Sequence, residues 1–351
     1  MFARKGTYPA APRAPRAARP VLPPNGVIVY DGPSTLDGTP VVVVLTSLRG
    51  TSANDKTSGD ALPLAQTYII PRAMLPAPGL AQGDAARAWA ANMGAGCDAA
   101  ACGACPLRPS TVAALKSQGL PAPDPCYVLN GPPDVARAVA DGRYPHVDLA
   151  TAAGYVRAML AAGRIAGVRG GSWGDPAAAP FAVHAALFDA VHDTAGRRLR
   201  VRHPDGRERR AVWTCYTRTW AYAPDVASPW RRIAMASAHS PAEAREALAR
   251  GWRPFTVVDG RSPEAVADAV ALVGSGPSTH CPASTERDLD ATCSTCGLCD
   301  GSRADIPADP RGPVMIMSHG NANRSAAAAC RAVAALQAMD DARRARAAAR
   351  R

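Results

Sequence analysis

Short apolar strands alternate with helices over much of this chain, and this alternation limits the fold more than any other feature of the sequence. Strand-like runs at 164–173, 211–216, 233–238 and 252–258 are separated by segments with helical periodicity. Such alternation predicts a parallel sheet whose strands are joined by crossover helices. The expected fold class is α/β, with a full or partial (β/α) barrel as its core.

Similar patterns predict the flanking elements. Further strands are expected at 26–30, 41–45, 67–70 and 314–318, a charged hairpin at 196–209, and helices at 84–93, 134–140, 149–162, 180–191 and 326–338. Ser240 and Ser262, each followed by Pro, are expected to begin helices. The predicted organisation is a disordered Pro/Arg-rich arm at 1–25, a single α/β domain at 26–320, and a C-terminal helix with a basic tail at 321–351.

The charge of the chain favours an anionic partner. The 351 residues carry a net charge of +11, so nucleic acid is an expected partner, although solvated arginine-rich ends are the alternative explanation. No apolar run approaches the ~20 residues that a bilayer requires, and the first residues lack the apolar core of a secretory signal. We therefore expect a cytoplasmic protein, in which clustered cysteines stay reduced and bind metal rather than form disulfides.

Eight of the ten cysteines fall into two groups, and the later group has the more specific spacing. Cys281, Cys293, Cys296 and Cys299 end in a C-x2-C-x2-C run, in which thiolates two residues apart reach one metal centre from a tight turn. This spacing predicts metal binding. It favours a cubane iron–sulfur cluster, and zinc is the alternative.

The earlier group lies in a segment that Pro106 and Pro109 predict to be a loop, and it predicts a second metal centre. Cys102, Cys105 and Cys126 are its expected ligands, and Cys97 is either a fourth ligand or an ordinary small apolar residue. Three ligands leave one iron of a [4Fe–4S] cluster open to a substrate or cofactor. Four ligands close the site and indicate a structural metal, as in zinc proteins.

These motifs resemble those of radical S-adenosylmethionine (SAM) enzymes, in particular the divergent, uncharacterised radical-SAM-like proteins of phages and prophages. Cys102, Cys105 and the Cys126-Tyr127 pair are similar to the spaced cysteines of that family, although the usual compact C-x3-C-x2-C is absent. The segment 173–176 (Trp-Gly-Asp-Pro) is similar to the family's Gly-Gly-Glu-Pro-like turn, with Asp in place of Glu. The resemblance covers roughly residues 66–320, and the segments 54–59 and 281–284 also resemble parts of the phage proteins.

The resemblance implies an iron–sulfur enzyme on a (β/α) barrel. Its reactive [4Fe–4S] cluster would be held by Cys102, Cys105 and Cys126, and the cysteines at 281–299 would hold an auxiliary cluster. Gly174, Asp175 and Pro176 would lie near the methionyl amine of SAM. Cleavage of SAM would give a radical that abstracts hydrogen from an unknown substrate, for which a nucleotide or a modified nucleic-acid base is the first expectation. The alternative function is a non-enzymatic, zinc-stapled protein of phage origin that binds nucleic acid.

Other candidate residues follow predicted strands. His239 and His319 come directly after strands, where a barrel places active-site groups, and His280 precedes a cysteine. Tyr216, Arg218 and Trp220 are candidates for stacking on a base or holding a carboxylate, with a half-buried strand as the alternative. Cys215 and Cys330 are expected to be packing residues.

Overall fold

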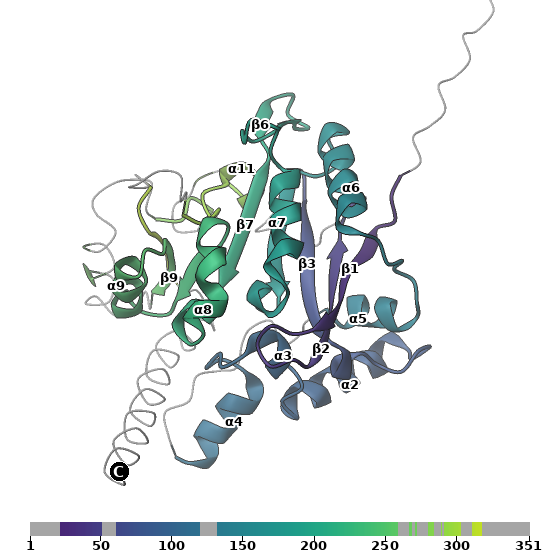
Figure 1. Cartoon of the computed structure of the whole chain (residues 1–351), viewed down its shortest axis with the longest axis vertical. Helices are drawn as coiled ribbons and strands as arrows, with labels where there is room; N and C mark the ends of the chain where they lie inside the picture. Colours follow the sequence, from purple (N-terminus) through teal and green to yellow (C-terminus); the bar gives the residue numbers. More distant parts are fainter. Residues whose placement is uncertain are drawn as a thin grey trace, which may run out of the picture.

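The computed structural model describes residues 22–50, 61–119, 132–258, 280–283, 291–302 and 311–317, together with residues 267, 268, 271 and 289. Its main feature is one eight-stranded sheet (Figure 1). Across that sheet, in order, lie β1 (Gly26–Pro33), β2 (Pro40–Thr46), β3 (Leu64–Pro71), β4 (Gly167–Trp173), β7 (Val212–Thr217), β8 (Met235–Ala238), β9 (Pro254–Val258) and β10 (Val314–Met317).

The sheet changes direction only at its amino-terminal side. β1, β2 and β3 pair antiparallel, whereas every neighbouring pair from β3 to β10 is parallel. Neighbours in the sheet follow one another along the chain, apart from the small hairpin of β5 (Arg200–Arg202) and β6 (Glu208–Arg210). The predicted α/β class and parallel sheet are confirmed. The sheet is open, so the described strands do not form a closed barrel.

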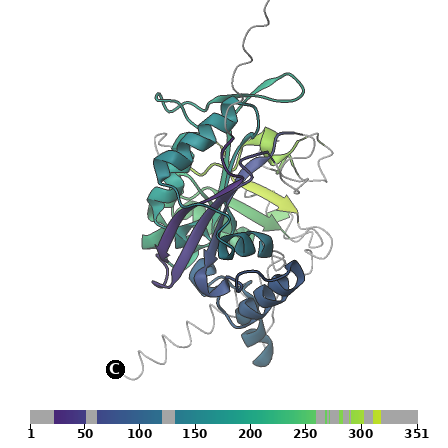
Figure 2. The same ribbon diagram turned by 90° about the vertical axis from the view of Figure 1, so that its right-hand side faces the viewer.

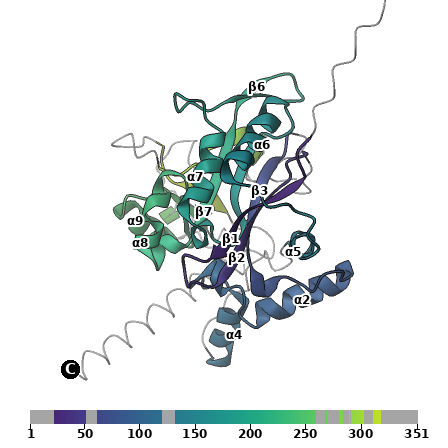
Figure 3. The same cartoon turned by 45° about the vertical axis from the view of Figure 1, so that its right-hand side comes forward.

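Helices connect the parallel strands. Those between β3 and β4 are α2 (Gln82–Gly94), α3 (Ala99–Cys102), α4 (Pro109–Ser117), α5 (Pro133–Ala140) and α6 (Leu149–Ala161). Those after β4 are α7 (Phe181–Ala190), α8 (Pro224–Ala227), α9 (Pro241–Ala249) and α11 (Cys293–Cys296), with short 3-10 turns at Arg72–Met74, Pro176–Ala178, Thr219–Ala221 and Ser228–Arg232. Figures 2 and 3 show α6 and α7 together on one side of the sheet, and α2 and α4 beyond one end of its strands.

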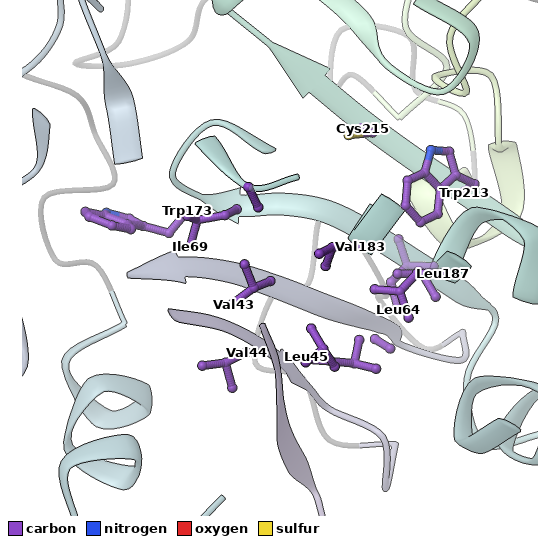
Figure 4. Close-up of a cluster of buried hydrophobic side chains, with 14 of the residues drawn as sticks. Val43, Val44, Leu45, Leu64, Ile69, Trp173, Val183, Leu187, Trp213 and Cys215 are labelled. Carbon is purple, nitrogen blue, oxygen red and sulfur yellow. The ribbon is translucent and has the colours of Figure 1, made fainter. Parts of the chain in front are cut away.

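The apolar core lies on both faces of the sheet. The valine run of β2 is fully buried, as expected for a strand covered on both sides. Val183 and Leu187 of α7 pack towards Leu64 of β3 and Trp213 of β7 (Figure 4). A second apolar cluster gathers residues of β7–β10 with the later cysteine segment, namely Met235, Cys281, Cys299, Val314 and Ile316, with Tyr216, Phe255, Val257, Ala283 and Leu298 packed against them.

Several local predictions are confirmed, and one is wrong. Ser240 caps α9, because its hydroxyl oxygen accepts a hydrogen bond from the Glu243 backbone N–H at 3.1 Å. The charged hairpin at 196–209 is present as β5 and β6. The segment around the first cysteines, expected to be a loop, contains α3 and α4, since Pro109 starts the second helix instead of breaking it.

Some expected features lie outside the described residues. They are most of the amino-terminal arm, the segment 54–59, the helix after Ser262 apart from residues 267, 268 and 271, His319, the helix at 326–338 with Cys330, and the basic tail. Within the part that the structure describes, no helix has both the length and the apolar character needed to cross a membrane.

A buried histidine makes the stability of the fold depend on pH. His184 of α7 is fully buried, its Nε2 atom lies 3.0 Å from the Thr67 hydroxyl of β3, and burial lowers the pKa of the imidazole to about 3. In the unfolded chain the same imidazole has a pKa near 6.5. The folded state therefore binds the proton more weakly, and stability present above pH 6.5 is lost as the pH falls towards 3.

We predict that the free energy of unfolding of the wild type drops by about 2 kcal/mol more than that of His184→Gln between pH 6.5 and pH 5, because each unit of pKa difference corresponds to about 1.4 kcal/mol. Urea denaturation at the two pH values measures this difference. Equal losses for the two proteins would show that His184 is not held neutral in the folded state.

Candidate active site and the second cysteine group

The carboxyl ends of the parallel strands bring the first candidate site together. β3, β4, β7 and β8 end at Pro71, Trp173, Thr217 and Ala238, and parallel strands place these ends along one edge of the sheet. In α/β proteins the loops at this edge carry the chemistry. The segments that follow β3 and β4 contain the earlier cysteines and the Gly-Asp-Pro turn.

The earlier cysteines lie on and around α3. Cys102 is the last residue of this helix, and the backbone N–H of Cys105 donates to the Cys102 carbonyl at 3.1 Å, which folds the C-x2-C segment into a turn. Cys97 precedes the helix and, like Cys102, packs against the main core. All three side chains are partly exposed thiols. Cys126, the third predicted ligand, lies outside the described residues.

The Gly174-Asp175-Pro176 turn lies directly against this cysteine helix. The Asp175 backbone N–H donates to the carbonyl of Ala101 at 2.6 Å, one residue before Cys102. Gly174 has φ +78°, and a Cβ atom there would lie 2.7 Å from the carbonyl oxygen of Ile69, so only glycine fits. The structure therefore places two predicted motifs, about seventy residues apart in the chain, in direct contact.

Tyr222 fixes the cysteine turn from the opposite side. Its hydroxyl donates to the Cys102 carbonyl at 3.1 Å and occupies the position that a side chain at Gly103 would need. Burial, and secondly the charge of Asp175, raise the pKa of Tyr222 well above its usual range. The phenol therefore stays protonated and keeps this hydrogen bond. The sequence analysis did not identify Tyr222, whose contact depends on tertiary structure.

The buried carboxylate of Asp175 joins β4 to β7. Its Oδ1 atom accepts from the Ala177 backbone N–H at 3.0 Å and the Thr217 hydroxyl at 2.7 Å. Its Oδ2 atom accepts from the backbone N–H groups of Arg218 at 2.6 Å and Thr219 at 3.0 Å. Burial raises the pKa of Asp175, and the donated hydrogen bonds oppose that rise.

These four donors leave the Asp175 carboxylate no acceptor position for a ligand. A carboxylate has about four acceptor positions, and all of them are used within the protein. Asp175 is also buried, so its side chain fixes the turn against β7. The predicted contact of this turn with a methionyl amine would therefore have to come from backbone carbonyls. The Asp175 carboxylate does not fit the role of amine ligand.

Other predicted residues at this edge lie in structural contacts. The Arg218 guanidinium donates to both carboxylate oxygens of Glu243, at 2.6 Å for Oε2, and Trp220 is fully buried with its indole N–H on the Ser237 carbonyl. Trp220 thus has no face open to a base, and the predicted stacking role for it is wrong. The hydrogen bond and charge of Arg218 lower the pKa of Glu243 despite burial, which alone would raise it.

His239 remains a partly exposed polar group at the end of β8. Its backbone N–H donates to Glu243 at 2.7 Å. Burial, and secondly the charge of Arg218, lower the pKa of its imidazole to about 4. At neutral pH His239 is therefore uncharged and able to donate and accept hydrogen bonds at the strand-end edge.

The second cysteine group packs beside β7 and β10, away from the cysteine helix α3. Cys293 and Cys296 span the single turn of α11, whose start is closed by a capping box between Thr292 and Thr295. Left-handed Gly297 ends this turn. The chain then runs beside β7, where the Cys215 N–H donates to the Cys299 carbonyl at 3.2 Å. Figure 1 shows α11 beside β7, away from α3.

The four later cysteines share one environment. Cys281 is attached to β10, since its N–H donates to the Met315 carbonyl at 2.8 Å. Burial raises the pKa of Cys299 well above its usual range, and the charges of the other three cysteines add to this rise. Burial also raises the pKa of Cys296 to about 11, with Cys281 and Cys293 adding to it. The structure therefore brings together the segments that the spacing predicted to converge.

Hydrogen bonds to sulfur support this group. The backbone N–H of Leu298 points to Cys296, and the Tyr216 hydroxyl to Cys299; each favours the thiolate. The predicted role of Tyr216 in holding a base or carboxylate stays a prediction. Among the described residues, no three His, Cys, Asp or Glu side chains are already arranged so that they would enclose a metal ion.

Asp300 anchors the loop that follows the last cysteine. This buried carboxylate pairs with Arg198, Arg253 and Arg311. The same arginines donate to backbone carbonyls of the loop, which are those of Gly297, Leu298 and Gly301. The cysteine loop is therefore fixed from several sides by charge-assisted hydrogen bonds.

The donor chemistry of both groups fits soft metals. Thiolates select zinc and iron–sulfur clusters, and buried thiols with raised pKa values become thiolates when a cation compensates their charge. The turn of α11, with an N–H aimed at sulfur, fits the second group to this role. For the first group, Cys102 and Cys105 are the fitting donors in the described part of the chain.

Comparison with known proteins gives no match: no family model, no curated protein and no solved structure matches this chain. The comparisons therefore assign no family and no fold relative.

We predict that Asp175→Asn lowers the free energy of unfolding by about 3 kcal/mol, because the amide leaves at least one buried donor without an acceptor and removes a buried charge that four donors stabilise. Chemical denaturation measures this loss, and Asp134→Asn on the exposed start of α5 is the control, expected to change stability by about 0.5 kcal/mol or less. An unchanged stability for Asp175→Asn would contradict the positioning role.

Proposed function

We propose that this protein is a radical-SAM-like iron–sulfur enzyme whose reactive cluster is held by Cys102, Cys105 and Cys126. The observation that carries the proposal is the contact of the Gly174-Asp175-Pro176 turn with the end of α3, at the carboxyl edge of consecutive parallel strands. Only the family resemblance predicted that the turn and the cysteine helix lie together, because β4 and α3 are far apart in the sequence.

The strand order supports a partial barrel. Six parallel strands, β3 to β10, lie side by side in chain order. Doubly wound sheets reverse their order at a switch point, whereas barrels keep it. We propose that these six strands form an incomplete (β/α) barrel to which β1 and β2 add an antiparallel extension.

The protein's own groups have defined parts in such a site. Tyr222 and the Asp175 backbone N–H hold the carbonyls at the end of α3, which positions Cys102 and Cys105 as ligands. Both cysteines are partly exposed, which leaves them within reach of a cofactor. When bound, a reduced [4Fe–4S] cluster supplies the electron that cleaves SAM and so permits hydrogen abstraction from a substrate.

Two further groups serve orientation at the same edge. His239 follows β8 at this edge, and its backbone N–H on Glu243 ties the strand end to α9. The buried Arg218–Glu243 pair holds the ends of β7 and β8 together. We propose that the substrate is a nucleotide or a modified base within nucleic acid, whose phosphates suit the net positive charge of the chain.

The later cysteines form a second metal centre in this proposal. The anchored loop and the sulfur-directed N–H group of Leu298 favour an auxiliary iron–sulfur cluster on Cys281, Cys293, Cys296 and Cys299. The one-turn C-x2-C of α11 equally suits zinc. That feature supports a second candidate function, a zinc-stapled protein that binds nucleic acid without catalysis.

We predict that anaerobic, reduced protein converts SAM to 5′-deoxyadenosine, and that Cys102→Ala, Cys105→Ala and Cys126→Ala each abolish this product. Cys97→Ala is the matched control from the same group, and we expect it to keep the activity because three ligands leave one iron open. Product is measured by chromatography.

Two results would contradict this assignment. If only Cys97→Ala lost the product, Cys97 would be a cluster ligand and the proposed set of Cys102, Cys105 and Cys126 would be wrong. Absence of product in wild-type protein that contains its full iron and sulfide would reject SAM cleavage.

A further inference from the structure

The β5–β6 hairpin presents an arginine face to solvent. Arg200 lies directly opposite Arg210 in the strand pair, and Arg202 lies opposite Glu208. These four side chains are exposed, whereas Val201 between them is buried against the body of the protein. Because strand side chains alternate between faces, Arg200, Arg202 and Arg210 share the outward face.

Arg200 and Arg210 do not stabilise the hairpin through an ion pair with a described residue, and the acidic residue opposite Arg202 is Glu208. None of the three forms an ion pair with any residue that the structure describes, whereas neighbouring Arg197 and Arg209 pair with Asp193 and Asp205. Like charges directly opposite each other destabilise a strand pair. A repulsive arginine pair kept on an exposed hairpin indicates that these side chains serve an external anion.

A fourth arginine extends the same surface. The turn between α6 and β4 lies against β5, since a Cβ atom on Gly163 would be 3.1 Å from the Arg202 carbonyl oxygen. Arg164 follows in this turn, is exposed, and likewise forms no ion pair within the described residues. Two neighbouring elements therefore carry exposed arginines, and we call these four residues the hairpin face: Arg164, Arg200, Arg202 and Arg210.

We propose that the hairpin face binds the phosphate backbone of double-stranded nucleic acid. Guanidinium groups bind phosphate oxygens through two parallel hydrogen bonds, and a projecting two-stranded ribbon has the dimensions to follow a groove of duplex DNA. Contacts of this kind give affinity without sequence specificity.

The chemistry of the hairpin favours nucleic acid over an acidic membrane. Membrane-binding surfaces add apolar side chains that insert between lipids. The large hydrophobic side chains exposed in the described part of the chain are Leu22, Leu248 and Leu289, and none belongs to the hairpin.

The hairpin face and the candidate active site lie at different ends of the molecule. Figures 1 and 3 place β6 at one end of the molecule, and α4 at the other end with the cysteine helix α3 near it. Nucleic acid bound there is anchored away from the candidate active site. This inference does not rest on the proposed enzymatic function: loss of binding would leave SAM cleavage unaffected.

The test measures binding of the full-length protein to a fluorescent 30-base-pair DNA duplex by anisotropy between 50 and 200 mM salt. With four phosphate contacts, we expect the wild-type affinity to fall on the order of 100-fold over this range. The triple variant Arg200→Gln, Arg202→Gln, Arg210→Gln should bind about tenfold or more weakly at 50 mM salt and lose only about 3-fold in affinity over the same range.

A charge-matched control separates the hairpin face from net charge. Arg87→Gln, Arg231→Gln and Arg245→Gln together remove three exposed arginines elsewhere and should retain most of the binding. Arg200→Lys, Arg202→Lys, Arg210→Lys keeps the charge and should retain most of the salt dependence, which also guards against misfolding of the first variant.

Three outcomes would overturn the proposal. Equal binding by the hairpin and control variants would assign DNA binding to other arginines. Absence of wild-type binding to the duplex at 50 mM salt would reject it, and so would binding to phosphatidylserine vesicles in place of DNA.

Discussion

The carboxylate of Asp175 is the interaction on which the arrangement of the candidate site depends. It accepts four hydrogen bonds from the turn after β4 and the turn after β7, while its own backbone N–H holds α3. Three segments separated by long stretches of chain are thereby fixed to one point. Because the group is buried, each of these bonds is stronger than it would be in water, and the loss of any acceptor is costly. These hydrogen bonds therefore fix the position of the cysteine turn.

The two cysteine groups now have different structural settings. The earlier group lies at the carboxyl edge of the sheet and is partly exposed. The turns next to it contain polar groups that form hydrogen bonds with other groups of the protein. The later group is packed among apolar side chains of β7–β10 and is anchored through Asp300. An exposed edge suits exchange of a cofactor and substrate, whereas a buried and braced loop suits a permanent centre. In the later group Cys281 and Cys299 are buried, whereas Cys293 and Cys296 are partly exposed like the described cysteines of the earlier group, so the two settings differ mainly through the Asp300 anchor.

Local sequence patterns predicted much of the fold. They did not predict contacts between residues that are far apart in the chain. The valine run of β2, the cap at Ser240 and the hairpin at 196–209 depend on neighbours in the chain, so their patterns were sufficient. The partners of Asp175 lie some forty residues further along, and only the register of β4 and β7 brings Thr217 and Thr219 to it. For the same reason the role of Tyr222 and the burial of Trp220 could not be deduced from composition or spacing. The Gly174-Asp175-Pro176 turn contacts the cysteine helix α3, and its acidic side chain has a positioning role that the motif alone does not reveal.

The central claim is that the two cysteine groups beside one parallel sheet each hold an iron–sulfur cluster. The measurement that tests it most directly is the iron, sulfide and zinc content of protein purified without oxygen. The account predicts brown protein with broad absorbance near about 400 nm and roughly eight irons and eight sulfides per chain, four of each for every cubane cluster. Colourless protein with stoichiometric zinc and no sulfide would contradict it.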